Sequence, residues 1–141
     1  MLRVLLNTNQ LVSSLLTKVG LQRQLVDLWR ERAFLLLLGP EQAEEVGEVL
    51  GRRKIARKYR IPAADRAAFV DLLRTEAVIL PSASPAGVCR DDADDDRLLG
   101  CAAAAGVEYL VTGDADLLTV GRFKQTVIVD ARAFLALLAE E

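Results

Sequence analysis

The sequence predicts an α/β fold, a three-layer α/β/α sandwich in which helices cover both faces of a mostly parallel sheet. Two observations support this prediction. Short apolar runs that suit buried strands alternate along the whole chain with longer segments whose apolar residues recur at helical spacing. No internal repeat, linker or low-complexity tract divides the 141 residues, so we expect a single domain over residues 1–141.

The predicted strands are short apolar runs, and residues that favour turns and helix ends follow most of them. They span residues 3–6, 34–38, 77–80, 108–112 and 127–129. Helices are predicted from residues 7–9 to about 16, after 20, from 40 to about 51, from 62 to about 74, from 94 to about 105, and from 131 to 138. We expect a loop at 81–85 and a turn at 113–116.

The composition excludes several classes of protein. Hydrophobic residues make up 52% and charged residues 27%, as in globular proteins, and no apolar run is long enough to cross a bilayer. The first residues enter an apolar run without the zones of a signal peptide, so we expect a cytoplasmic protein. Because Cys89 and Cys101 are the only cysteines and lack metal-binding spacing, we expect two small buried thiols.

The absence of histidine narrows the possible chemistry. Without it the chain has neither the commonest general base, nor a serine triad, nor a His-ligated metal site. Any catalysis must therefore depend on carboxylates, lysine or a metal ion. The net charge of −2 creates no overall field that attracts nucleic acid, so such binding requires a local basic patch.

Polar residues directly follow two of the predicted strands. These are Asn-Thr-Asn at residues 7–9 and Thr-Gly-Asp-Ala-Asp at residues 112–116. Because ligands bind beyond the carboxyl ends of parallel strands, we expect both clusters on one rim, toward which Asp95 and Glu45 could also point. Convergent acidic side chains suit Mg²⁺ or Mn²⁺. Such an ion can lower the pKa of bound water and stabilise the charge on a leaving oxygen.

Each acidic element also has a simpler interpretation. Residues 94–96 suit the positive end of a helix dipole without any ligand. Asp114 and Asp116 are common turn formers, and Glu45 belongs to a run of glutamates typical of a solvated helix face. Only the combination of these elements indicates a metal site.

The segment 51–60 is the one basic patch in the sequence. It could hold a phosphate backbone while Tyr59 stacks on a base, or it could be an ordinary solvated charged segment. Its candidate RNA-binding residues are Arg52, Arg53, Lys54, Arg57 and Lys58.

Together, these motifs resemble those of the PIN-domain family over nearly the whole chain. They are residues 7–9 after the first strand, then 45–50, 94–99 and 109–118. The segment from Cys89 to Leu118 is similar to the branch described as toxin components of toxin–antitoxin systems. Within it, Val-Thr-Gly-Asp at residues 111–114 is the most specific piece.

The resemblance implies a PIN-like α/β/α fold and a ribonuclease that depends on Mg²⁺ or Mn²⁺. It also implies a substrate of single-stranded or structured RNA, a homodimer and, for the toxins, a restraining antitoxin protein. The composition separately leads us to expect no membrane association. The implied catalytic and metal-binding residues are Asn7, Glu45, Asp95 and Asp114, with Asp116 as an additional metal ligand. The implied supporting residues are Thr8, Asn9 and Thr112.

Asn7 departs from the family pattern, which has aspartate at this position. Its neutral carbonyl oxygen should weaken both metal binding and water activation. Three explanations stay open: a member that has lost activity, a member that works with weaker metal binding, or a substitution made to silence a toxic enzyme. Gln10 also departs, because the pattern has an apolar residue there.

The sequence leaves three candidate functions. The first is a metal-dependent endoribonuclease that acts as a toxin, and the second is a catalytically inactive PIN-like module that binds RNA or a protein. The third is a phosphoacceptor or phosphatase-like α/β domain. That function requires an aspartate nucleophile after the first strand, and Asn7 cannot serve as one.

Overall fold

The computed structural model describes residues 1–81, 85–89 and 92–140, so residues 82–84 of the predicted loop lie outside it. A six-stranded sheet with the order β3-β2-β1-β4-β6-β5 forms its centre. The strands are β1 (Arg3–Leu6), β2 (Leu35–Leu38), β3 (Val78–Ile79), β4 (Tyr109–Val111), β5 (Arg122–Phe123) and β6 (Thr126–Val129). Among the strands of the described ranges, only β5 and β6 pair antiparallel, which confirms the predicted mostly parallel sheet.

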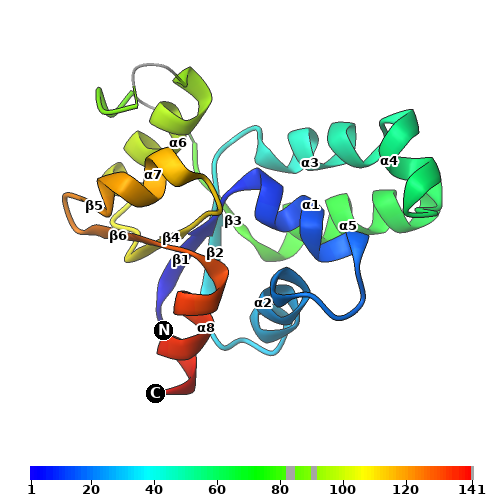
Figure 1. The fold of residues 1–141 in the computed structure, drawn as a ribbon, viewed down its shortest axis with the longest axis horizontal. Helices are drawn as coiled ribbons and strands as arrows, with labels where there is room; N and C mark the ends of the chain where they lie inside the picture. Colours follow the sequence, from blue (N-terminus) through cyan, green and yellow to red (C-terminus); the bar gives the residue numbers. More distant parts are fainter. Residues whose placement is uncertain (82–84, 90–91, 141) are drawn as a thin grey trace.

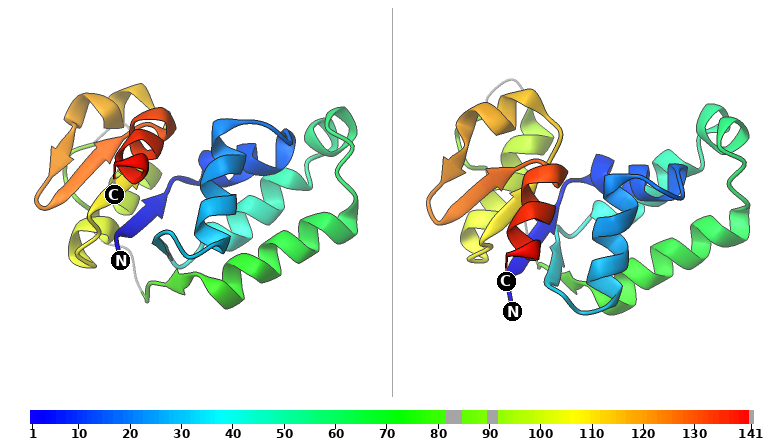
Figure 2. Two further views of the ribbon diagram at one scale, coloured as in Figure 1. Left: turned by 90° about the horizontal axis from the view of Figure 1, so that it is seen from below. Right: turned by 60° about the horizontal axis from the view of Figure 1, so that its bottom comes forward.

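The described residues form helices on both faces of this sheet (Figures 1 and 2). They are α1 (Thr8–Leu16), α2 (Leu21–Arg30), α3 (Gln42–Leu50), α4 (Arg53–Lys58), α5 (Ala63–Glu76), α6 (Ala93–Ala104), α7 (Ala115–Val120) and α8 (Ala131–Ala139). Helices α6 and α7 pack on one face, and α1, α2, α3, α5 and α8 pack on the other. The three layers are those predicted. None of the helices in the described ranges is long and apolar enough to cross a membrane.

The two faces of the sheet carry separate hydrophobic cores. On β1, Val4 and Leu6 belong to the core under α1 and α2, whereas Leu5 belongs to the core under α6 and α7. In β2, Leu36 and Leu37 divide in the same way. Successive side chains of a strand point to opposite faces, so a strand covered on both sides must be apolar throughout. This requirement explains why the strands appear as unbroken apolar runs in the sequence.

The chain departs from the predicted elements after β4, where the expected turn is the start of α7. The Asp114 carboxylate accepts hydrogen bonds from the backbone N–H groups of Asp116 and Leu117 at 2.9 and 3.1 Å, which caps this helix. The buried Leu117 side chain fixes it to the core. Gly121, with φ of 73°, ends the helix, and a turn at Lys124, with φ of 53°, then lets β6 pair antiparallel with β5.

The basic segment also forms a helix that the sequence did not predict. Helix α4 lies between α3 and α5 at the end of the molecule farthest from β5 (Figure 1). No residue of α4 is buried, so it lacks the apolar stripe by which a surface helix is recognised in a sequence.

Gln10 is buried where the sequence pattern has an apolar side chain. It is 7% exposed, and its Oε1 has no hydrogen-bond partner among the described residues. A Cβ added to Gly113 would lie 3.3 Å from its Nε2, so the glycine leaves room for this amide. An unpaired buried acceptor costs about 1–3 kcal/mol. Gln10 thus packs against the β4–α7 turn at Gly113 with one buried acceptor unpaired.

Candidate functional site

The parallel pairing of β1 with β4 brings the two polar clusters together, as predicted. The Asn7 N–H donates to the Val111 carbonyl at 3.0 Å, and the Asn7 Nδ2 donates to the Thr112 Oγ1 at 3.1 Å. Both side chains are buried, and the Thr112 Oγ1 also accepts from the Asp114 N–H at 3.1 Å. Asn7, Thr112 and Asp114 thus form one hydrogen-bonded group at the carboxyl edge of the sheet.

The Asn7 side chain has a second function as the N-cap of α1. Its Oδ1 accepts from the Asn9 N–H at 3.3 Å, which satisfies one of the unpaired donors at the start of the helix. Its Nδ2 faces Thr112 and also the carboxylate of Asp95, to which it donates a hydrogen bond. The amide therefore acts mainly as a donor toward the site, where an aspartate would act only as an acceptor.

Asp95 is the most electrostatically perturbed carboxylate of the site. Burial, which has the largest effect, and the charges of Asp92 and Asp114 together raise its pKa to about 6, although the hydrogen bond from Asn7 opposes them. A carboxylate surrounded by other carboxylates favours its protonated form unless a positive charge compensates. Asp95 and Asp114 therefore form an acidic pair across the ends of α6 and α7.

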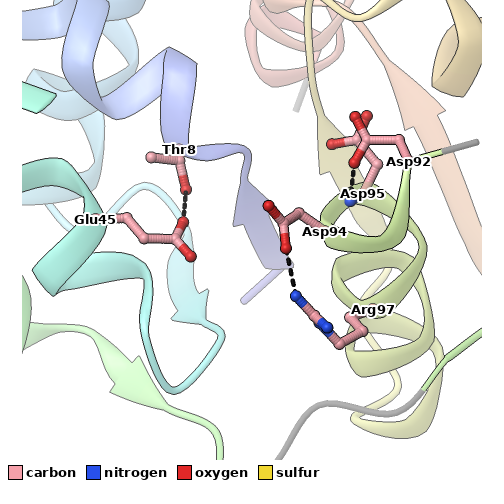
Figure 3. A network of polar contacts seen from close by, with 6 residues as sticks. All are labelled: Thr8, Glu45, Asp92, Asp94, Asp95 and Arg97. Atoms are coloured by element: carbon pink, nitrogen blue, oxygen red, sulfur yellow. Dashed lines mark hydrogen bonds and ion pairs between the residues drawn. The ribbon is translucent and has the colours of Figure 1, made fainter.

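Glu45 lies on the opposite side of the site, in the first turn of α3. Its Oε2 accepts a hydrogen bond from the Thr8 hydroxyl at 3.1 Å. Figure 3 shows this pair facing the start of α6, where Asp94 is ion-paired with Arg97 and Asp92 accepts from the Asp95 N–H. Acidic side chains thus approach from two helices that belong to opposite layers of the fold.

A pocket of about 760 Å³ separates these two acidic walls. The predicted site residues that line it are Asn7, Thr8, Asn9, Glu45, Asp95 and Arg52. Among the described residues, Thr112 and Asp114 do not line the pocket, although Thr112 is hydrogen-bonded to both Asn7 and Asp114, and Asp116 is exposed at the start of α7. Five of the eight predicted catalytic, metal-binding and supporting residues thus line one pocket, whereas Thr112, Asp114 and Asp116 do not.

The basic residues extend from this pocket along α4. Arg52 lines the pocket and lies 3.9 Å from Glu48 in an exposed ion pair. The side chains of Arg53, Lys54, Arg57 and Lys58 are exposed on α4. The Lys58 Nζ lies 5.3 Å from the centre of the Tyr59 ring. This ring is half-buried, so it is less available for stacking than the sequence suggested.

Residues 3–116 match the family model of the PIN domain, a stretch that includes both acidic walls of the pocket. The chain belongs to the PIN-domain family. PIN domains are generally nucleases, and they typically use divalent metal ions. No curated protein matches this chain.

A PIN-like fold is also seen in a solved structure, the crystal structure of PAE2754 from Pyrobaculum aerophilum. It aligns with a TM-score of 0.68 over 99% of this chain and 91% of that chain, at 20% sequence identity. At this identity the similarity shows the fold alone.

The donor set of this PIN domain fits a hydrated divalent ion rather than a closed cage. Within residues 1–81, 85–89 and 92–140, no three acidic or cysteine side chains are grouped so that they hold a metal ion by themselves. Mg²⁺, however, keeps several waters and commonly takes only one or two protein carboxylates. The pair of Asp95 and Asp114 meets that requirement, and its repulsion is the kind that a cation relieves.

Asp96 is a residue of this PIN domain whose importance the sequence analysis missed. It is 6% exposed, and its carboxylate accepts four backbone N–H groups. The donors are Ala86 and Gly87 at 2.9 Å each, Val88 at 2.8 Å and Cys89 at 2.7 Å. These bonds lower the pKa of Asp96 and fix the preceding loop to the start of α6, beside Asp95.

A sequence signal for Asp96 does exist. Asp96 stands three, four and seven residues before Leu99, Gly100 and Ala103, which are all buried, so it lies on the apolar face of α6. A buried acid on that face requires hydrogen-bond donors. The same loop leaves Cys89 half-buried, against expectation, whereas Cys101 is buried as expected.

We predict that Asp96→Asn lowers the thermal unfolding midpoint at pH 7, because the amide replaces an acceptor oxygen with a donor that faces other N–H groups. Since the folded-state pKa is depressed, the wild-type stability from Asp96 is present above the unfolded pKa of about 3.9. It is lost as the pH falls through the folded value. The midpoints of the two proteins should therefore converge on acidification, as followed by circular dichroism.

The control is Asp94→Asn, on the exposed face of the same helical turn. This variant should cost much less stability at pH 7, because surface ion pairs contribute little. Equal losses for both variants would contradict the structural role given to Asp96.

Proposed function

We propose that this PIN domain is an endoribonuclease that cleaves single-stranded RNA with water activated by Mg²⁺ or Mn²⁺. The observation that carries the proposal is the pocket between Glu45 and Asp95, with Asn7 at the carboxyl end of the sheet between them. The family, which consists generally of nucleases, supports the reaction class. The phosphodiester of the substrate would enter this pocket from the side of Arg52.

The residues in and around the pocket have separate roles in this proposal. Asp95 and Asp114 would hold the ion, with Asp116 at the outer edge and Glu45 facing them across the pocket. When bound, such an ion lowers the pKa of the water that it holds and neutralises charge on the phosphate. Asn7 holds Asp95 and Thr112 in place through its Nδ2, and Thr8 holds Glu45 through its hydroxyl. Asn9, exposed at the pocket mouth, is available to the RNA.

Asn7 sets the level of activity expected within this proposal. An amide contributes no charge toward the ion, so metal binding should be weaker than with an aspartate. The alternative function is a catalytically inactive PIN-like module that binds RNA or a protein through the same surfaces. The two functions differ in one result: whether the pocket cleaves RNA once residue 7 carries the negative charge of an aspartate.

Asn7→Asp should strengthen Mn²⁺ binding and raise cleavage of single-stranded RNA. We expect each to change by at least roughly tenfold, which is the lower end of the range seen when a residue that supports a metal ligand is changed. Isothermal titration with Mn²⁺ and a fluorescent RNA cleavage assay measure the two effects. The double variant Asn7→Asp/Asp95→Asn is the control and should show neither gain. A restored protein that binds Mn²⁺ tightly but leaves RNA intact would favour the binding-module function instead.

Helix α4 provides the RNA-binding surface in both functions. The double variant Arg57→Ala/Lys58→Ala should weaken RNA binding and reduce the slope of log affinity against log salt by about 0.7 for each lost phosphate contact. Arg122→Ala/Lys124→Ala is a matched control at the opposite end of the molecule. It also removes an exposed Arg and a Lys whose Nζ lies over an aromatic ring, at 5.5 Å from the centre of Phe123. Equal losses in both double variants would indicate a response to net charge alone.

A toxin role would add an antitoxin and a homodimer to this proposal. A second groove, of about 520 Å³, has a lining that would suit an acidic, amphipathic segment of an antitoxin. Its apolar lining includes Leu15, Leu16, Ile61 and Leu72, and its charged lining is Lys18, Arg23, Arg30 and Arg60 against Asp65. We infer that such a segment places apolar side chains on the floor and carboxylates on the rim.

The test uses the protein encoded by the gene beside this one as the binding partner. Arg30→Glu/Arg60→Glu should weaken that complex by at least roughly tenfold, because like charges across an interface cost several kcal/mol. Sedimentation of each component alone measures whether this chain is a dimer. An unchanged affinity would remove the groove from the proposal, and a monomeric chain would remove the dimer.

A further inference from the structure

Gln42, at the start of α3, joins the carboxyl ends of the two central strands. Its side chain is 4% exposed. The Oε1 accepts from the Gly39 N–H at 2.7 Å, and the Nε2 donates to the Leu6 carbonyl at 2.8 Å. Leu6 ends β1 and Gly39 follows β2, and the ladder between these strands pairs Leu5 with Leu37. The side-chain amide therefore bridges β1 and β2 with hydrogen bonds just beyond the last backbone pair of these strands.

The second N–H of the same amide points to Thr8, a residue that lines the pocket. The Gln42 Nε2 also lies 3.4 Å from the Thr8 Oγ1, which in turn donates to the Glu45 Oε2 at 3.1 Å. A hydroxyl carries a single hydrogen, so a Thr8 oxygen that accepts from Gln42 directs its own hydrogen toward Glu45. Each bond in such a chain polarises the next. Gln42, Thr8 and Glu45 thus form a directed relay from the sheet to the acidic wall of the pocket.

We propose that Gln42 is a positioning residue that sets the orientation of the Glu45 carboxylate through Thr8. This inference rests on the proposed function, in which Glu45 faces the metal and the phosphodiester. Gln42 anchors the relay to the central sheet, because both of its backbone partners lie at the ends of buried strands. The Glu45 side chain is only half-buried, and without the hydrogen bond from Thr8 it would sample several rotamers.

A purely structural role for Gln42 makes a different prediction. In that case the amide only joins β1 to β2, and Thr8 and Glu45 are bystanders. Gln42→Met would then lower stability without changing the metal site. The two roles can be separated because Thr8→Val breaks the relay alone and leaves both bonds from Gln42 to the backbone intact.

The experiment is a double-mutant cycle in the Asn7→Asp protein, with Mn²⁺ as the probe. Thr8→Val and Gln42→Met should each weaken Mn²⁺ binding on the order of tenfold, as for loss of a partner around a metal ligand. The double variant should bind as weakly as either single variant, because both changes interrupt one path. Thr8→Ser, which keeps the hydroxyl, should restore binding. Only variants that carry Gln42→Met should show a large loss in thermal midpoint.

Additive losses of Mn²⁺ affinity, or an affinity unchanged by Gln42→Met, would overturn the proposal. Crystal structures of the original chain and of its Gln42→Met variant supply a readout that does not depend on the metal. The Glu45 carboxylate should leave Thr8 in the variant, and an unmoved Glu45 refutes the relay. If no protein in the series binds Mn²⁺, the proposed nuclease function fails, while these structures still decide the role of Gln42.

Discussion

The parallel pairing of β1 with β4 is the constraint on which the site depends. It places Asn7 and Thr112 side by side where the two strands end, and it does so through the backbone, because the Asn7 N–H continues the ladder to Val111. Helices α1 and α7 begin just beyond that edge, with Asn7 and Asp114 as their caps. A residue that caps a helix at a strand end has little freedom, so the site is assembled on rigid elements before any ligand arrives.

The sequence predicted the sheet and most helices because both faces of the strands are buried and the helices carry apolar residues at regular spacing. The same logic explains the elements that it missed. Helix α4 has no buried residue and therefore no apolar period, and α7 has only six residues, too few for a period to appear. Strand β5 has only two residues and pairs with β6 through a tight turn at Lys124, which is a property of the backbone rather than of a sequence pattern.

The residues of the site divide in the same way. Asn7 and Thr112 were predictable because their position relative to strand ends is a matter of counting along the chain. Asp96 and Gln42 were not predicted, because their roles depend on which donors the folded chain presents to them. Asp96 meets a loop that precedes it by seven to ten residues, and Gln42 meets groups from two different strands. These contacts are tertiary, so the sequence can place Asp96 on the buried face of α6 but does not show which hydrogen-bond donors meet it there.

Charge balance gives Asn7 its significance. Asp95 already has a raised pKa because it is buried near Asp92 and Asp114, and the Asn7 amide supplies the N–H that partly offsets this repulsion. An aspartate at the same place would remove that donor and add another negative charge, which either a bound cation or a proton would have to balance. The amide therefore makes the acidic site stable by itself, and it lowers the electrostatic demand for an ion. The same asparagine that lowers the repulsion within the acidic group thus places no charge beside the metal ion that we propose for this pocket.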